Sequence, residues 1–130
     1  MLFEDKELAC KHCGMLILHP GFRETLVFLR ETFNKPMIVR SCCRCKEHND
    51  SEAVKGHPES MHICDFPAHK DKGQRGTASI DIETPDGAYR GELFALAWKL
   101  GWSIGWNAKS RFLHLDRRDW FGFKQTSFDY

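Results

Sequence analysis

The stretch Ala78-Ser79-Ile80-Asp81-Ile82-Glu83, together with its later counterpart Phe112-Leu113-His114-Leu115-Asp116, decides how this chain of 130 residues folds. Side chains of a β-strand alternate between its two faces. The isoleucines of the first stretch therefore share one face, and Asp81 points to the other. In the second stretch the leucines share one face and His114 points away from them. Each stretch predicts a strand with an apolar face for the core and a polar residue opposite it.

A third candidate donor, His62, precedes these strands in a turn-rich loop. Zinc binds imidazole nitrogen and carboxylate oxygen, and its catalytic sites use three protein ligands and leave the fourth position to water. Such a metal lowers the pKa of that water to roughly 7 and polarises a scissile carbonyl group. His62, Asp81 and His114 therefore predict a zinc hydrolase. A hydrogen-bonded strand histidine and a surface carboxylate are the structural alternative.

The composition is that of an ordinary globular domain, with 42% hydrophobic residues, 28% charged residues and a net charge of +1. At this length we expect one domain with its own core. The near-neutral charge argues against a nucleic-acid or membrane surface, and no apolar run approaches the ~18 residues that span a bilayer. We see no secretory signal and expect a cytoplasmic protein whose six cysteines are thiols or metal ligands.

The order of the expected elements predicts a small α+β domain with one mostly antiparallel sheet flanked by helices. Hydrophobic spacing and turn residues predict helices over 22–33 and 88–100, and strands over 37–40, 78–83, 102–106 and 112–117. The intervening residues 42–77 show no clear period, and a loop this long is expected to be functional or held by ligands. The aromatic tail from Trp120 to Tyr130 is expected to pack back on the domain.

Several segments, taken in order, resemble the M15 family of zinc peptidases. The family comprises D-Ala-D-Ala carboxypeptidases and peptidoglycan L-Ala-D-Glu endopeptidases, including small phage endolysins. The matching segments are Ser60-Met61-His62, Gly76-Thr77-Ala78-Ser79-Ile80-Asp81-Ile82, the strand with His114, Val39-Arg40-Ser41-Cys42-Cys43-Arg44 with His48-Asn49, and the opening from Glu7 to Gly14. The resemblance covers almost the whole chain. It implies a Hedgehog/DD-peptidase-like fold, a peptidoglycan stem peptide as substrate and one catalytic zinc.

The spacing of the ligands departs from that family. Relatives usually place the ligand Asp seven residues after the first His, whereas nineteen positions separate His62 and Asp81. We interpret residues 63–76 as an inserted loop, which makes Asp65 and His69 rival ligands. A strand holds a ligand more rigidly than a charged loop does, so Asp81 is preferred and His69 is expected to face solvent.

The proton-handling group departs as well. Relatives carry an acid three residues before the last His, where this chain has Arg111, which cannot act as a base. Asp116 lies two residues after His114 on the same face. We expect it to serve as the catalytic acid or base, or to orient a ligand, with Glu83 and Asp119 as substitutes.

Further residues are expected around the substrate. The resemblance implies that Arg44 binds the carboxylate of the peptide or stabilises the oxyanion of the intermediate. Ser60 is expected to order the turn that presents His62. Ser60 and Trp106 are expected to line the substrate cleft.

The cysteines predict a second, structural zinc site. Cys10 and Cys13 have chelating C-x2-C spacing, and a second pair can come from Cys42, Cys43 and Cys45, with Cys43 and Cys45 preferred. Such an ion would hold the N-terminus against the loop. Buried free thiols, which pack as small hydrophobic groups, are the alternative.

The interpretation favoured by these residues is a monomeric phage endolysin or related cell-wall peptidase. It would accumulate in the cytoplasm of the producing cell and act on the wall after release, without binding nucleic acid or membrane. Two alternatives stay open. His48-Asn49 and the paired cysteines also suit a metal-dependent nuclease of the His-Asn-His kind. A non-catalytic, zinc-bearing wall-binding domain would fit the absence of an acid at position 111.

Overall fold

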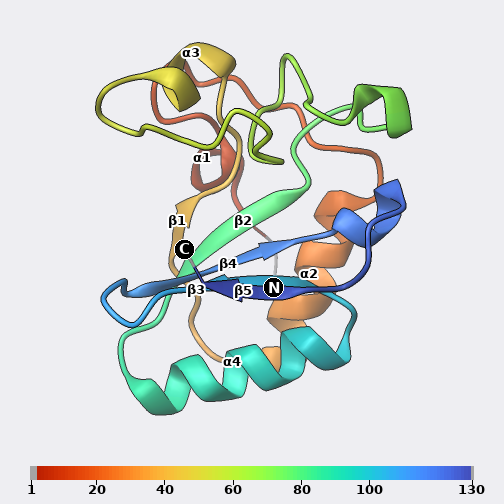
Figure 1. Ribbon diagram of the computed structural model, residues 1–130. Helices are drawn as coiled ribbons and strands as arrows, with labels where there is room; N and C mark the ends of the chain where they lie inside the picture. Colours follow the sequence, from red (N-terminus) through yellow and green to blue (C-terminus); the bar gives the residue numbers. More distant parts are fainter. Residues whose placement is uncertain (1–2, 130) are drawn as a thin grey trace.

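Five strands form one mostly antiparallel sheet at the centre of the molecule, which confirms the predicted α+β class (Figure 1). The computed structural model describes residues 3–129. Across the sheet the strands follow the order β1-β2-β4-β3-β5, and only β3 and β5 pair in parallel. Their bounds are β1 (Val39–Ser41), β2 (Ser79–Glu83), β3 (Ser103–Trp106), β4 (Phe112–Asp116) and β5 (Ser127–Asp129).

Two long helices enclose the hydrophobic core against the sheet. Helix α2 (Phe22–Phe33) ends at Asn34, whose left-handed backbone (φ 52°) closes the last turn. Helix α4 (Gly87–Lys99) begins at Asp86, whose carboxylate accepts a hydrogen bond from the backbone N–H of Tyr89 at 2.8 Å. The core contains buried residues of both helices and of both central strands: Phe22, Leu26, Leu29, Phe33, Leu93, Ala97, Ile80, Ile82, Leu113 and Leu115.

The pairing of β2 with β4 sets the position of the polar residues. In this antiparallel register Asp81 lies opposite His114, and Ile80 lies opposite Leu115. The apolar side chains of both strands therefore enter the same core, as the period-two pattern predicted. Asp81 and His114 are left side by side on the other face of the sheet.

The loop between β1 and β2 covers that second face, and Figure 1 shows it, yellow to green, on the opposite side of the sheet from α4. The prediction that residues 42–77 lack regular structure is wrong in part, because α3 (Lys46–Asp50) and the 3-10 helix η1 (Lys70–Lys72) lie within them. Backbone pairing also orders the loop. Arg44 N–H donates to the His62 carbonyl, and Cys64 N–H donates to the Arg44 carbonyl, both at 2.9 Å.

Three short elements were not expected from the sequence: α1 (Asp5–Leu8), the 3-10 helix η2 (Arg118–Phe121) and β5. The tail packs back on the domain, because Phe121 is buried in the core and Phe128 lies in β5. Tyr130 lies outside the described residues. Within the described residues, no helix has the length and apolar character needed to cross a membrane.

Candidate metal centre

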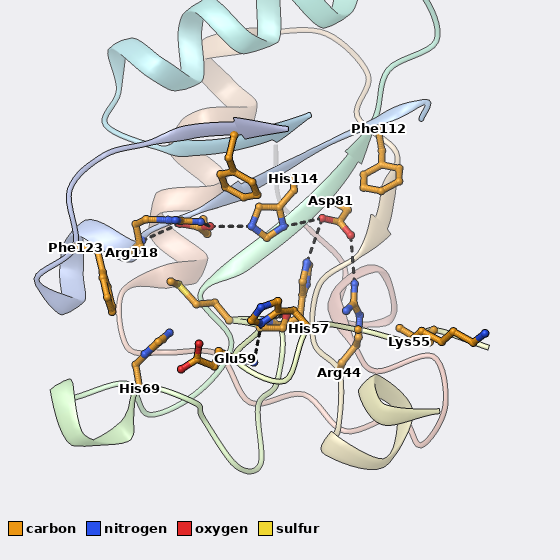
Figure 2. Close-up of a pocket in the computed structure, with 17 residues that line it drawn as sticks. Arg44, Lys55, His57, Glu59, His69, Asp81, Phe112, His114, Arg118 and Phe123 are labelled. Atoms are coloured by element: carbon orange, nitrogen blue, oxygen red, sulfur yellow. Dashed lines mark hydrogen bonds and ion pairs between the residues drawn. The ribbon is translucent and has the colours of Figure 1, made fainter. Parts of the chain in front are cut away.

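The side chains of His62, Asp81 and His114 meet at one point. Figure 2 shows Asp81 and His114 side by side there. One donor atom from each lies within 4.8 Å of the other two. His62 Nε2 and His114 Nδ1 both lie 3.1 Å from Asp81 Oδ1. The structure thus brings together the three ligands that the sequence predicted across the inserted loop.

Different parts of the fold deliver these three side chains. Asp81 and His114 are cross-strand neighbours in β2 and β4. His62 comes from the loop, where its N–H donates to Ser60 Oγ at 3.1 Å and its carbonyl accepts from Thr77 Oγ1 at 2.8 Å. Ser60 therefore orders the turn before His62, as the sequence predicted.

The outer nitrogen of each imidazole has its own acceptor. His62 Nδ1 lies 2.7 Å from the Cys42 carbonyl oxygen, and His114 Nε2 lies 2.8 Å from Asp116 Oδ2. Carbonyl and carboxylate oxygens only accept, so a ring that gives its inner nitrogen to a metal keeps its proton on this outer nitrogen and donates it. In the neutral rings the remaining lone pairs both face Asp81 Oδ1. His62 Nε2, His114 Nδ1 and Asp81 Oδ1 therefore face one another, and only protons or a cation can lie between them. Metal-binding histidines are held in the same way, by an acceptor at the outer nitrogen of the ring.

The charges of the site follow from its burial and its neighbours. Burial opposes ionisation of Asp81, but the imidazoles of His62 and His114 outweigh it and hold the pKa of this carboxyl well below its usual range. Burial lowers the pKa of His62, which keeps its ring neutral near pH 7. Burial also acts to lower the pKa of His114, but hydrogen bonds to Asp116 and Asp81 raise it to about 9. A metal must therefore displace a proton from His114.

The donor set fits zinc: two imidazole nitrogens, one carboxylate oxygen and an acceptor behind each ring. The group is a candidate metal centre in a small α+β domain. No family model, curated protein or solved structure matches the chain. The Hedgehog/DD-peptidase-like topology and the peptidase activity stay predictions, and the function is argued from the site.

A cleft of about 780 Å³ opens over the candidate metal centre. Its walls include Arg44 and Ser60, as expected, but Trp106 is not among the residues that line it. Trp106 ends β3 and pairs with Asp129 of β5. The lining comprises Arg44, Val54, Lys55, Gly56, His57, Glu59, Ser60, Met61, His62, His69, Asp81, Phe112, His114, Asp116, Arg118, Phe123 and Phe128.

Arg44 lies directly beside the candidate metal ligands. Its Nη2 is 3.4 Å from Asp81 Oδ2, its Nη1 donates to Asn49 Oδ1 at 3.0 Å, and its Nε donates to Ser41 Oγ at 3.1 Å. Burial lowers the pKa of this guanidinium, although the Asp81 carboxylate opposes the shift. These contacts fix a cationic donor at the wall of the cleft, within reach of a group bound there.

Asp116 contacts the far side of His114 from Asp81. It is 1% exposed and accepts from His114 Nε2, while its other contacts come from the N–H, Nε and Nη2 of Arg118. Of the two roles that the sequence suggested for Asp116, these contacts support orienting a ligand. Neither suggested substitute lines the cleft: Glu83 does not border it, and Asp119 pairs with Arg117 at 2.6 Å.

The rival ligands in the inserted segment have other partners. Asp65 Oδ1 accepts from the N–H of Lys46 at 2.9 Å. The expectation that His69 faces solvent is wrong, because its partly buried ring packs against Phe123 with centroids 4.9 Å apart. Neither side chain joins the group of His62, Asp81 and His114.

A second candidate metal group contains Cys10, Cys13 and Cys45. The sequence suggested that Cys43 belongs to this group, but the structure leaves it out, and the free Cys43 thiol instead hydrogen-bonds to the free thiol of Cys64. Sequence spacing could not have found the contact of Cys43 with Cys64, since residues distant in the chain form it.

The placement of Phe112 in the cleft was foreseeable, because it lies two residues before His114 on the same strand.

Proposed function

We propose that this protein is a zinc-dependent peptidase that hydrolyses an amide bond in peptidoglycan stem peptides. The observation that carries the proposal is the convergence of His62, Asp81 and His114 at a cleft, with one nitrogen of each histidine 3.1 Å from the same oxygen of Asp81. The resemblance of the ordered segments to M15 peptidases supports the choice of substrate. A bound zinc ion supplies Lewis-acid chemistry, polarising a carbonyl group and lowering the pKa of a water molecule.

The residues around the centre have separable roles in this proposal. His62, Asp81 and His114 hold the ion, and Asp116 positions His114 through its Nε2. Arg44 binds a substrate carboxylate or the oxyanion that develops at the scissile carbonyl, because its guanidinium lies 3.4 Å from a metal-binding carboxylate.

Proton transfer needs a carboxylate that can reach the substrate. Asp116 is enclosed by His114 and Arg118, whereas Glu59 also lines the cleft. Within residues 3–129 the Glu59 carboxylate makes no hydrogen bond or ion pair. Figure 2 shows Glu59 on the loop that faces His114 across the cleft. We propose that Glu59 accepts the proton of the attacking water, in place of the acid that is missing at position 111.

The lining suits an extended acidic peptide. Arg44 and Lys55 supply positive charge along one wall. Phe112, Phe123 and Phe128 supply apolar surface for the methyl groups and chain of the substrate. A stem peptide, which carries free carboxylates between alanine methyl groups, matches this combination.

The test compares metal content and hydrolysis in four purified chains. Wild type should bind zinc at the centre and release fragments from stem peptides. Asp81→Ala should lose both properties, and Glu59→Gln should lose hydrolysis while keeping the metal. Asp65→Ala is the matched control, because its carboxylate contacts Lys46 and not the centre. Full metal content at the centre in Asp81→Ala would overturn the ligand assignment.

The same preparations separate the alternatives. Wild type that binds cell walls and cuts no stem peptide would indicate the non-catalytic wall-binding domain. Plasmid nicking that survives His114→Ala would indicate a His-Asn-His nuclease. Asn49 is fully buried, accepts from Arg44 and donates to the His57 carbonyl at 3.0 Å, which argues for a structural role and against the nuclease.

A further inference from the structure

The cysteine group at the N-terminus forms a second cluster of metal-ligating atoms outside the cleft. The sulfur atoms of Cys10, Cys13 and Cys45 all lie within 4.8 Å of one another. Cys10 and Cys45 are buried, while Cys13 is exposed. Three thiols at one point supply three of the four ligands that a structural zinc requires. Because one of them is exposed to solvent, an ion can reach the cluster.

Backbone N–H groups point at two of these sulfurs. The N–H of Cys45 donates to Cys10 Sγ, and the N–H of His48 donates to Cys45 Sγ, both at 3.4 Å. Such donors stabilise the thiolate form of sulfur, which is the form that binds a metal. The N–H of His48 also caps α3 through this contact, and without a metal burial raises the pKa of the Cys45 thiol to about 11.

Two histidines lie near the sulfur cluster, and the contacts decide between them as the fourth ligand. Cys10-x-x-Cys13 places two donors three residues apart, and Cys45-x-x-His48 repeats that spacing. His48 therefore holds the position in the second half that Cys13 holds in the first. Its ring stacks on that of His12 with centroids 5.5 Å apart, and His12 Nδ1 lies 3.5 Å from Cys45 Sγ. The imidazole nitrogen at the edge of the sulfur cluster is therefore that of His12, and the ring of His48 stacks on it.

We propose that Cys10, Cys13, Cys45 and His12 bind a structural zinc ion. Bond lengths of about 2.3 Å to sulfur and 2.0–2.1 Å to nitrogen place tetrahedral ligands about 3.5–3.8 Å apart. The contact between His12 Nδ1 and Cys45 Sγ, at 3.5 Å, already has this length. The ion would join the turn 10–13 to the start of α3, two segments separated by more than thirty residues.

This ion would also brace the catalytic centre, a step that rests on the proposed function. The segment 42–45 ends in the ligand Cys45 and supports the centre at two points. The Cys42 carbonyl accepts from His62 Nδ1 at 2.7 Å, and Arg44 contacts Asp81. The same segment is tied to the N-terminal region, because Cys43 N–H donates to the Leu8 carbonyl at 2.9 Å. Zinc at the cysteines would hold both supports in place.

Cobalt substitution distinguishes the two sites, because only thiolate ligands give an intense sulfur-to-cobalt charge-transfer absorption. Wild type should bind two cobalt ions and show this band. Cys13→Ser should bind one ion and lose the band, whereas His62→Ala should bind one and keep it. Cys64→Ser is the matched control and should keep both ions, since Cys64 pairs with Cys43. One ion per wild-type chain without the band would overturn the proposal, whatever the peptidase assay gives.

The fourth ligand has its own test. His12→Ala should weaken the charge-transfer band and His12→Cys should restore it, whereas His48→Ala should leave it intact. Loss of the band in His48→Ala alone would overturn the assignment of His12. If the ion braces the centre, hydrogen exchange at the amides of Arg44 and Cys64 should speed up in Cys13→Ser while the β2–β4 amides stay protected. Unchanged exchange at both amides would overturn that step.

Discussion

At the scale of single residues, the candidate centre depends on groups that orient its ligands. His114 could rotate about its side-chain bonds, but Asp116 holds its Nε2 at 2.8 Å and turns Nδ1 toward Asp81. Asp116 is itself held by three donors of Arg118. Burial opposes its ionisation, but the hydrogen bonds from His114 and Arg118 outweigh it and keep the pKa of Asp116 well below its usual range. The acceptor behind the ring is therefore always charged near neutral pH.

Removal of that acceptor should weaken the metal centre. We expect Asp116→Ala to lower zinc affinity about 10–100-fold, because the ring loses its orientation and its proton acceptor. Asp116→Asn, which keeps one accepting oxygen, should lose less. Competition with a chelator of known affinity measures both, and Asp119→Ala provides a neighbouring control. Unchanged affinity with a large loss of turnover would instead make Asp116 the proton acceptor of the reaction.

The pH dependence of zinc binding should report on His114. Its pKa in the metal-free protein is raised to about 9, so below that pH the ion must displace one proton. We expect apparent affinity to rise about tenfold per pH unit from pH 7 and to level off near pH 9. The measurement uses Cys13→Ser, which isolates the centre from the cysteine site. Asp116→Ala should level off at a lower pH, and an affinity that stays flat from pH 7 to 9 would contradict the assignment.

At the scale of elements, the sequence predicted the strands whose residues alternate regularly between apolar and polar. Alternation fixed β2 and β4 to within one residue and placed Asp81 and His114 on one face. Strand β5 was missed because it has three residues and is held by long-range contacts, such as Thr126 N–H to Ser103 Oγ at 2.9 Å. The same reason hid the pairing of Cys43 with Cys64, since tertiary packing and not spacing decides which thiols meet.

The junction of the inserted loop with β2 depends on Gly76. A Cβ atom there would lie 2.7–2.8 Å from backbone atoms of Ile17, Leu18 and His19. Those atoms cannot retreat easily, because backbone hydrogen bonds join Thr77 to both Ile17 and His19. We expect Gly76→Ala to lower the free energy of unfolding by about 1–3 kcal/mol.

Chemical denaturation measures this change, and α4 supplies the control. A Cβ at Gly91 would meet no atom within 4 Å, and the residue lies inside the helix. Gly91→Ala should therefore raise the free energy of unfolding by about 0.5–1 kcal/mol, since alanine favours helix. Equal effects of the two substitutions would show that backbone crowding at Gly76 is not what holds the junction.

At the scale of the whole molecule, the sheet separates two sources of stability. The hydrophobic core lies between the sheet and helices α2 and α4. The opposite face is covered by the loop 42–77, which contains short elements and few apolar residues of the core. Two candidate metal groups join this loop to the rest of the chain, one through β2 and β4 and one through the N-terminal turn. Metal binding would thus stabilise the loop 42–77, which contributes few residues to the hydrophobic core.

The stability of the whole chain should therefore depend on free zinc with a slope that counts the sites. Each site that binds only the folded chain adds about 1.4 kcal/mol to the free energy of unfolding per tenfold increase in free zinc above its dissociation constant. Wild type, with two sites, should show about 2.7 kcal/mol per tenfold, and His62→Ala or Cys13→Ser about half of that. Unfolding in zinc buffers, with magnesium as the control ion, gives these slopes. The two-site proposal would be contradicted if wild type showed the slope of one site and only one of the two variants abolished it. The site altered in the other variant would then bind no zinc.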